Sequence, residues 1–155
     1  MSLSIRSVSV ADHAVLLPLL DAYAAEMRGV LHGQAAANGT AIAALLAAEP
    51  CTELLAAWRE DVPQGFALFY DLPEIVFARR CGQLDDLFVT PAARGRGIAR
   101  ALVEAVAETG RARGWSHLRW FVPESDRAAI ALYERIAERA PWRSYIQRLD
   151  PGASL

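Results

Sequence analysis

Hydrophobic and polar residues alternate at the start of the chain, and this alternation predicts a strand from Leu3 to Val8. From Ala11 to Met27, apolar residues recur at helical spacing and predict a helix, which Pro18 is expected to kink or divide in two. A loop is predicted from Gly29 to Asn38, and a second helix from Thr40 to Ala48. The first third of the chain is therefore expected to contain one strand and two helices.

The middle of the chain has the pattern of consecutive strands. Apolar runs predict strands at Thr52–Arg59 and Gly65–Leu72, joined by a turn around residues 61–63. A further strand is predicted at Cys81–Val89. The segment Pro73–Arg79 fits either a loop or an extension of an edge strand.

The second half alternates between helices and strands. One apolar stripe follows Gly95–Arg113, which is the clearest predicted helix, and a strand is predicted at Ser116–Val122. Ser125 can cap a helix that runs to about Glu138, and Trp142–Leu149 is predicted to close the chain as a strand. Strand–helix–strand units imply right-handed crossovers and some parallel pairing, so the sequence predicts an α/β fold.

The composition fits one globular domain. The 155 residues are 54% hydrophobic and 22% charged, so residues 1–155 are expected to fold around a single core. The formal net charge of −2 gives no general attraction to nucleic acid, and no nucleic-acid partner is expected. All 16 Lys and Arg positions are arginines, which excludes a Schiff-base lysine, a P-loop lysine and acetylation of the chain's own lysines.

The two cysteines, Cys51 and Cys81, are thirty residues apart. They form no Cys-x-x-Cys pair and no Cys/His spacing typical of a metal site, so neither a metal site nor a disulfide framework is predicted. Both thiols are expected to be buried and inert, in a reduced, cytoplasmic setting. No apolar run reaches the ~18 residues that span a membrane, and no signal peptide is recognisable, so no membrane partner is expected.

The stretch from Leu84 to Arg100, LDDLFVTPAARGRGIAR, carries the strongest chemical signal. A predicted strand leads through Thr90-Pro91 into a turn rich in glycine and arginine, which opens into a helix. A helix start offers free backbone N–H groups, and glycines let a phosphate approach them closely. The pattern therefore predicts a pyrophosphate site. The alternatives are a solvated basic helix start and a Rossmann dinucleotide turn, although Gly-x-Gly-x-x-Gly is absent.

This stretch resembles the acetyl-CoA-binding motif of the GCN5-related N-acetyltransferases (GNAT). Residues 94–99 satisfy Arg/Gln-x-x-Gly-x-Gly/Ala, and Leu87-Phe88-Val89-Thr90-Pro91 precede them. The resemblance extends from Leu84 to Tyr133, and more loosely over the whole chain. It implies a mixed, mostly antiparallel sheet of six to seven strands, about four helices, and strands that splay apart at the cofactor site.

The resemblance also implies how acetyl-CoA is held as co-substrate. Backbone amides of the turn bind the pyrophosphate, with arginines 94, 96 and 100 adding charge-assisted hydrogen bonds. A bulge separates the preceding strand from its neighbour, so that the pantetheine arm inserts there and a backbone N–H polarises the thioester carbonyl. The implied cofactor-binding residues are Leu87, Phe88, Val89, Arg94, Gly95, Arg96, Gly97, Ile98, Ala99, Arg100, Asp126, Ala129 and Tyr133.

A second segment, residues 126–133, resembles the family's Asn-x-x-Ala-x-x-x-Tyr. Asp126 stands where asparagine is usual, which removes an amide donor, whereas Ala129 and Tyr133 match. The resemblance implies that Tyr133 acts as the acid that protonates the departing CoA thiolate. The alternative is that Tyr133 is a core-facing aromatic residue.

Asp85 and Asp86 are the candidates for handling the amine. They resemble the acidic pair of the polyamine acetyltransferases, whose strand reads Leu-Glu-Asp-Phe-Phe-Val, and either could bind a cationic amine or start a water relay. Strand alternation places them on opposite sides unless a bulge intervenes, and a surface pair that caps a hairpin is the alternative. The secondary candidates for the acceptor pocket are Tyr23, Glu26, Tyr70, Asp71 and Glu74.

The sequence as a whole therefore predicts an N-acetyltransferase that moves acetyl from acetyl-CoA to a primary amine of a small molecule, such as a polyamine, by direct attack. A protein or peptide amine, an amino acid or antibiotic amine, and a non-catalytic acyl-CoA-binding module are the alternatives. Histidines 13, 32 and 117 are scattered, and His117 is expected to be structural. A homodimer is expected from the superfamily and from the aromatic terminal strand.

Overall fold

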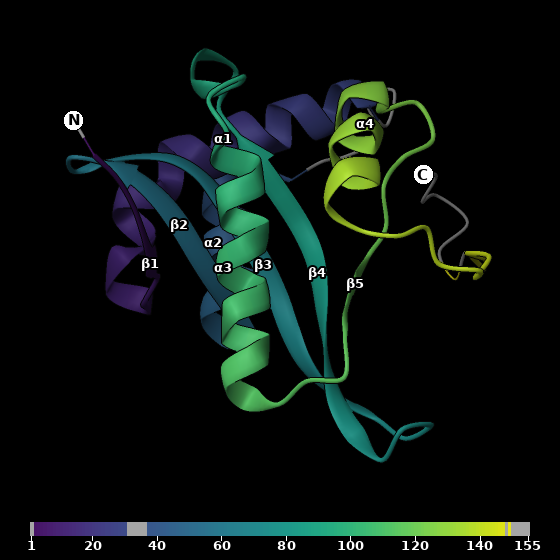
Figure 1. Ribbon diagram of the computed structural model, residues 1–155. Helices are drawn as coiled ribbons and strands as arrows, with labels where there is room; N and C mark the ends of the chain where they lie inside the picture. The colour runs from purple at the N-terminus through teal and green to yellow at the C-terminus, as the bar shows by residue number, and fades with distance from the viewer. Residues whose placement is uncertain (1, 31–36, 148, 150–155) are drawn as a thin grey trace.

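The computed structural model describes residues 2–30, 37–147 and 149 (Figure 1). Two short 3-10 helices, Val10–Asp12 and Pro91–Ala93, accompany the main elements. The strands and α-helices are β1 (Leu3–Ser7), α1 (His13–Val30), α2 (Gly39–Ala48), β2 (Thr52–Arg59), β3 (Val62–Glu74), β4 (Arg79–Val89), α3 (Ile98–Arg113), β5 (Leu118–Trp120) and α4 (Arg127–Ile136).

The described strands form one mixed sheet in the order β1-β2-β3-β4-β5. The first three pairings are antiparallel, and β5 lies parallel to β4. Helix α3 covers one face of the sheet, α1 and α2 cover the other, and α4 lies beside β5 (Figure 1). The α/β fold class and the mostly antiparallel sheet are therefore confirmed.

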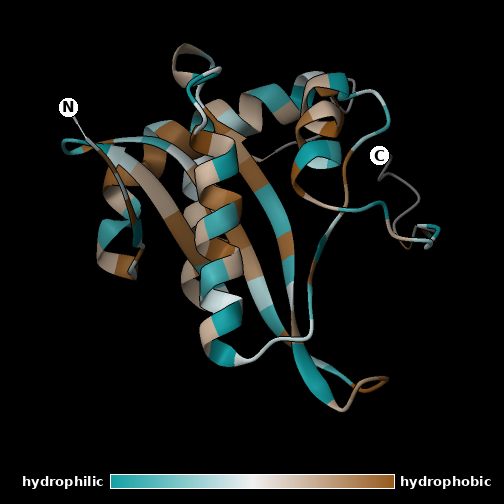
Figure 2. Cartoon of the chain, in the orientation of Figure 1, coloured by the Kyte–Doolittle hydropathy of each residue, from teal (hydrophilic) through white to brown (hydrophobic). Residues whose placement is uncertain are grey.

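Two apolar clusters, one on each face, hold the layers together. Alternate residues of β2 divide between them: Leu55 and Ala57 pack toward α3, whereas Leu54 and Trp58 pack toward α1. A strand covered on both faces has no solvated side, which explains why β2 and β3 are continuous apolar runs (Figure 2). No helix in the described part of the chain is both long and apolar enough to cross a membrane.

The predicted six to seven strands are reduced to five among the described residues, because Trp142–Leu149 forms no strand there. Trp142 and Tyr145 are 84% and 85% exposed. Strand backbone needs a neighbouring strand for its hydrogen bonds, and no described segment pairs with the outer edge of β5. Apolar and aromatic content alone therefore gave a wrong prediction for this segment.

Several element boundaries also differ from the prediction. Helix α1 is continuous through Pro18, since its buried face of Leu16, Leu19 and Leu20 compensates for the lost hydrogen bond. Part of Pro73–Arg79, for which a loop or a strand extension was predicted, is strand and part is loop: β3 extends to Glu74, β4 begins at Arg79, and the residues between them form the connecting loop.

Near the C-terminus, β5 is shorter than the predicted strand, and the cap of α4 is Asp126 instead of Ser125. The Asp126 carboxylate accepts a hydrogen bond from the Ala129 N–H at 3.0 Å. Much of the predicted loop at Gly29–Asn38, including His32, lies outside the described residues.

The two cysteines have different surroundings. Cys81 is fully buried, and burial raises the pKa of its thiol. Cys51 is exposed, because it precedes β2 in the turn after α2 instead of lying inside a strand. The prediction that both thiols are buried is therefore wrong for Cys51.

One irregularity of the sheet shapes the site. Leu68 lies opposite Asp86, but the next residue of β3, Phe69, lies opposite Leu84, so Asp85 is an extra residue in β4. The pairing of β4 with β5 covers only residues 82–84 of β4. Strand β5 ends at Trp120, which lies opposite Leu84, so the β4 edge from Asp85 onward has no strand partner on that side, as the predicted splay requires.

Candidate active site

The turn after β4 is shaped by two glycines. Gly95 and Gly97 have φ angles of +74° and +78°, a left-handed conformation that side chains with a Cβ atom rarely adopt. Gly97 caps α3, which begins at Ile98. Within residues 37–147, no amide N–H from Gly95 to Arg100 donates to another protein group. The turn therefore presents free donors at the positive end of a 16-residue helix, an arrangement suited to an anion.

The three arginines of the turn, at positions 94, 96 and 100, differ in their contacts. The Arg94 guanidinium donates to the Val89 carbonyl at 3.0 Å and pairs with Glu26 of α1 at 2.5 Å. It thus braces the turn against α1 instead of pointing freely into solvent. Arg96 and Arg100 are exposed, and neither forms an ion pair with a described residue. These two arginines are the ones available to an anionic ligand.

The direction of backbone amides along β4 follows from one hydrogen bond. The Thr90 N–H donates to the carbonyl of Gln64 in β3 at 2.9 Å. Because amide directions alternate along a strand, the amide of Phe88 also points toward β3, and those of Leu87 and Val89 point toward the open edge. The structure therefore brings Leu87 and Val89, rather than Phe88, to the edge that the sequence assigned to the pantetheine arm.

The side chain of Phe88 has a different surrounding. It is 4% exposed and lies in the cluster between the sheet and α1, with its ring 5.7 Å from that of Tyr23. Its contribution is to the core that supports the turn.

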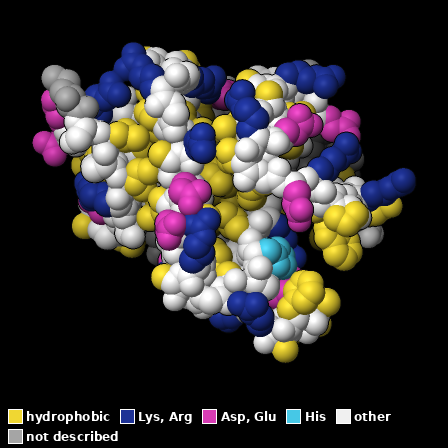
Figure 3. Space-filling model, viewed as in Figure 1, with side chains coloured by type: hydrophobic (Ala, Val, Ile, Leu, Met, Phe, Trp, Pro, Cys, Tyr) yellow, Lys and Arg dark blue, Asp and Glu magenta, His cyan; other side chains and the backbone are white. Residues whose placement is uncertain are grey.

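A hollow of about 400 Å³ lies between α3, β5 and the end of α4. The apolar part of its lining includes Leu118, Trp120 and Val103, and Arg100 and Arg135 add positive charge. The lining also contains Glu104, whose carboxylate is paired with Arg111. On this face, apolar side chains are visible between α3 and the later elements, with basic side chains nearby (Figure 3). The hollow extends the positive turn with a surface that is part apolar and part basic.

Tyr133 lies on α4 above this side of the sheet. Its ring packs edge-on against Trp120, with centroids 5.3 Å apart, and the side chain is half-buried. Burial, followed by the negative charge of Asp126, raises the pKa of Tyr133 to about 12. The hydroxyl therefore keeps its proton throughout the neutral pH range.

A second cavity, of about 540 Å³, lies on the opposite face of the sheet, under α1 and α2. Asp85 and Asp86 both line it, because the bulge changes the strict alternation of the strand. Its other polar lining residues are Tyr23, Tyr70, Glu49 and Thr52. Most of the remaining wall is apolar and comes from Leu20, Ala24, Met27, Ala37, Ile42, Leu45, Leu46, Phe66 and Leu68.

Asp86 and Tyr23 form a hydrogen-bonded pair in this cavity, in which the tyrosine hydroxyl donates to the carboxylate. Burial raises the pKa of Asp86, the charge of Asp85 acts in the same direction, and the bond from Tyr23 opposes both. The pKa of Tyr23 is raised by burial and by the two carboxylates. Asp85 itself is exposed and accepts a bond from the Gln83 amide at 3.3 Å. The cavity thus holds a half-buried carboxyl group beside an exposed one.

A family model described as the acetyltransferase (GNAT) family matches residues 19–137, which is more than half of the chain. The chain belongs to the GNAT acetyltransferase family. The predicted family and its enzyme class, an acyl-CoA-dependent N-acetyltransferase, are thereby confirmed.

Similar proteins give the family a narrower context. The thialysine N-epsilon-acetyltransferases of Caenorhabditis elegans and Sus scrofa are 35% and 31% identical to this GNAT chain over 79 and 81 residues. The matched segments cover 49% and 50% of this chain and 47% and 48% of the two relatives. The chain thus spans about half the length of the curated relatives it matches.

Solved structures match over almost the full chain. A ribosomal-protein-alanine N-acetyltransferase from Brucella melitensis biovar Abortus 2308 has a TM-score of 0.83 at 33% identity and covers 96% of this chain and 100% of its own. An aminoglycoside acetyltransferase from an uncultured soil metagenomic sample has a TM-score of 0.76 at 26% identity, covering 97% of this chain and 100% of its own. The two proteins are named for different acceptors, although they share the fold.

The secondary candidates of this GNAT chain fall into separate places. Tyr23 and Tyr70 line the cavity under α1 and α2, whereas Glu26 lies outside its lining and holds Arg94. Asp71 pairs with Arg80 and Arg113, and Glu74 pairs with Arg119. Among the secondary candidates, only the two tyrosines therefore line this cavity.

The sequence prediction missed Glu49 and Thr52 in the cavity lining. No sequence motif marks these residues, and they reach the cavity because Glu49 caps the end of α2 and β2 begins at Thr52, whose N–H donates to the Glu49 carbonyl at 3.2 Å. Asp126 acts as the cap of α4, a task that asparagine performs equally well, so the substitution preserves the local structure.

Proposed function

We propose that this GNAT chain transfers the acetyl group of acetyl-CoA to a primary amine of a small molecule by direct attack in a ternary complex. The observation that carries the proposal is the position of the bulge at Asp85. It marks where β4 and β5 separate, and it also brings Asp85 and Asp86 into the cavity under α1 and α2. The open edge and the carboxylate cavity therefore meet at one point of β4.

Binding of acetyl-CoA is supported by the donors around the open edge. The free amides of residues 95–100 and the positive end of α3 suit the diphosphate, and Arg96 and Arg100 add charge. The part-apolar hollow between α3 and α4 suits the less polar portions of the same molecule. The amides of Leu87 and Val89 offer hydrogen bonds to an extended arm laid along β4.

The chemical step needs one oxyanion stabiliser, one base and one acid. The amine nitrogen attacks the thioester carbon, and an amide on the open edge, that of Leu87 beside the bulge, stabilises the oxyanion. The C–S bond then breaks, and the thiolate takes a proton from Tyr133. Burial that raises the pKa of Tyr133 also raises the proton affinity of a poorly solvated thiolate, so transfer between them remains feasible.

Asp85 and Asp86 have different proposed roles toward the amine. Asp85 is exposed and attracts the incoming ammonium group, whereas the half-buried Asp86 accepts the proton that the amine must lose, directly or through water. The bond from Tyr23 fixes the orientation of Asp86. Asp85→Asn should therefore raise KM for a cationic amine more than it lowers kcat, and Asp86→Asn should mainly lower kcat.

A cationic small amine, such as a polyamine, is the acceptor that the paired carboxylates favour. A protein amine is a second candidate, supported by the 33% identity to a ribosomal-protein-alanine N-acetyltransferase over nearly the whole chain. A small amine fits a cavity of about 540 Å³ completely, whereas a peptide would leave most of its length outside.

We also propose a homodimer, in which a second copy covers the exposed aromatic residues of the C-terminal segment. Trp142, Tyr145 and Ile146 are each at least 59% exposed, and Trp142 and Tyr145 lie only three residues apart. Large aromatic side chains gathered on one segment are typical of interfaces.

An acetylation screen tests the proposed activity. The protein is incubated with acetyl-CoA and a panel of polyamines, amino acids, aminoglycosides and N-terminal peptides, and released CoA is measured with a thiol reagent. We expect amine-dependent CoA release, strongest with small cationic amines. Strongest release with peptides would favour the second candidate. If acetyl-CoA binds but no amine accelerates its consumption, the chain is a non-catalytic acyl-CoA-binding module.

A further inference from the structure

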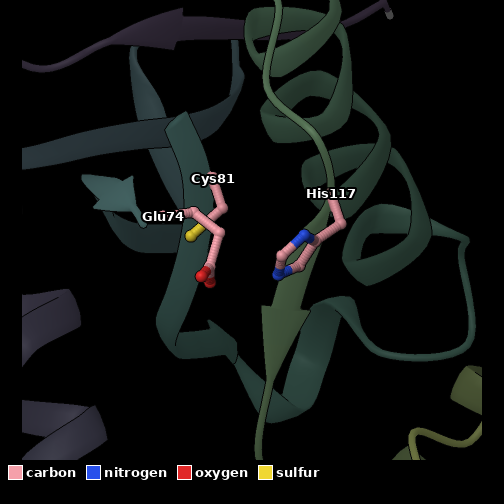
Figure 4. Close-up of side chains that lie close together, drawn as sticks. All are labelled: Glu74, Cys81 and His117. Carbon is pink, nitrogen blue, oxygen red and sulfur yellow. The ribbon is translucent and has the colours of Figure 1, made fainter. Parts of the chain in front are cut away.

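Three side chains that can bind metal converge near the base of the β4–β5 pairing. Glu74 ends β3, Cys81 lies near the start of β4, and His117 directly precedes β5 (Figure 4). One carboxylate oxygen, the thiol sulfur and one ring nitrogen all lie within 4.8 Å of one another. This cluster is separate from the lining of both cavities.

Strand register explains why the three residues share a face. Leu72 lies opposite Cys81, and Glu74 is two residues further along β3, so Glu74 and Cys81 project from the same side. Gly82 of β4 lies opposite Leu118 of β5, so these two residues face the same side of the sheet. Cys81 and His117 each precede one of them by one residue, and therefore both face the opposite side. The cluster is therefore built into the pairing of three adjacent segments.

We propose that Glu74, Cys81 and His117 form a binding site for a divalent transition metal, with zinc as the expected ion. Thiolate, imidazole and carboxylate are ligands that zinc accepts together, whereas magnesium and calcium prefer oxygen ligands alone. Three protein ligands leave a fourth position of a tetrahedral zinc for water or another small ligand.

The hydrogen bonds around His117 determine which of its ring nitrogens can bind a metal ion. The Ser116 hydroxyl donates to the Arg80 carbonyl at 3.2 Å, and its oxygen lies 2.9 Å from Nδ1 of His117. A hydroxyl has one hydrogen, so with that hydrogen on the carbonyl it accepts the Nδ1 hydrogen. The lone pair of the neutral ring is then on Nε2. This is the outer hydrogen bond that metal-binding histidines usually make.

Burial supports a defined site. Cys81 is fully buried, and the Glu74 side chain is 13% exposed. The Phe77 ring packs edge-on against His117 at 6.0 Å. Ligand atoms about 2.0–2.3 Å from one zinc ion lie roughly 3.3–3.8 Å apart, so the three atoms, which lie within 4.8 Å of one another, must approach by at most about 1.5 Å. Rotation of Glu74, which now pairs with Arg119 at 3.3 Å, provides that movement.

Cobalt titration tests the ligands directly, because a thiolate bound to Co²⁺ gives a charge-transfer band in the near ultraviolet. We expect one equivalent of Co²⁺ to produce this band and excess Zn²⁺ to abolish it. Cys51→Ser, which removes the exposed thiol, should keep the band, and Cys81→Ser should lose it. No band in the wild-type chain, or a band that survives in Cys81→Ser, would overturn the proposal.

Two further variants separate metal binding from folding. Glu74→Gln conserves size and should weaken zinc binding at least tenfold, as measured by competition with a chromogenic chelator, while the metal-free Tm changes little. Ser116→Ala should weaken binding by about tenfold, because it removes the bond that holds the ring. Zinc should raise the Tm of the wild-type chain. Equal zinc affinity in the wild-type chain and both variants would refute the site.

Discussion

At the scale of single residues, burial controls the proton chemistry of this protein. Tyr133, Tyr23 and Asp86 have raised pKa values, and burial is the largest cause in each. All three are therefore held in their protonated forms to higher pH than free side chains. That state suits an acid, whereas a base such as Asp86 must lose its proton before it can act.

Replacing Tyr133 with phenylalanine isolates the hydroxyl, because the ring can keep its contact with Trp120. We expect kcat to fall by about 10²-fold or more, the usual contribution of a positioned acid, while acetyl-CoA affinity changes less than about twofold. Steady-state kinetics and calorimetric titration measure the two quantities. Parallel losses in both would assign Tyr133 to cofactor binding instead.

Asp86→Asn should separate activity from stability. The folded state raises the pKa of Asp86 above 3.8, so it binds the proton more tightly than the unfolded chain does. Stability from this group is therefore present at low pH and decreases as pH rises through the folded pKa. The asparagine cannot ionise, and it can still accept the Tyr23 hydrogen bond.

We therefore expect Asp86→Asn to have a higher Tm than the wild-type chain at pH 7, with the difference shrinking toward pH 4, while kcat falls about 10²-fold. The acid limb of the wild-type pH–rate profile should lie above pH 3.8 and be absent from the residual activity of the variant. Thermal melts and rate profiles across this pH range are the measurements. A Tm lower than wild type at pH 7 would contradict the sign.

At the scale of elements, the turn between β4 and α3 is the proposed binding site for the diphosphate of acetyl-CoA. Its backbone depends on left-handed conformations at Gly95 and Gly97, and Arg94 fastens it to Glu26 of α1. In the proposed complex, most hydrogen bonds to the diphosphate come from amides whose directions are fixed by the helix start. Changes of backbone geometry should therefore affect the cofactor more than loss of one arginine does.

Gly97→Val should destabilise the fold by about 1–3 kcal/mol, because a β-branched residue is strained at a φ of +78°. It should also weaken acetyl-CoA binding at least tenfold by crowding the free amides. Gly114→Val is the matched control, since Gly114 ends the same helix at a φ of +72°. Denaturant melts and calorimetry should give similar stability losses, with weaker cofactor binding in the Gly97 variant alone. Equal cofactor affinities would contradict the assigned turn.

At the scale of the whole molecule, the sequence predicted the elements and motifs that local residue patterns encode. It missed the features that arise from contacts between segments distant in the sequence. Periodicity predicted α3, an apolar run predicted β2, and the motif at Leu84–Arg100 predicted the turn. The bulge at Asp85 arises from register between two strands, which no residue identity announces. For the same reason, spacing along the chain gave no sign of the cluster at Glu74, Cys81 and His117.

Substitutions in the C-terminal segment test the proposed homodimer. Replacing Trp142 and Tyr145 with serine should convert the proposed dimer to a monomer, because the exposed aromatic contacts are lost. Val62→Ser, at an exposed position in the β2–β3 hairpin, should leave the dimer intact. Sedimentation equilibrium measures the mass. A wild-type chain that sediments as a monomer would refute the dimer.

The proposed binding sites of the two substrates differ in whether main-chain or side-chain groups form them. Much of the proposed diphosphate site consists of main-chain amides from 95 to 100, whereas the proposed acceptor cavity consists largely of side chains from α1, α2 and three strands. Point mutations replace side chains and leave peptide groups in place. Evolution can therefore exchange one acceptor for another by single substitutions in the cavity while the acetyl donor stays constant, and laboratory selection for new acceptors should begin with Met27, Ile42 and Leu45.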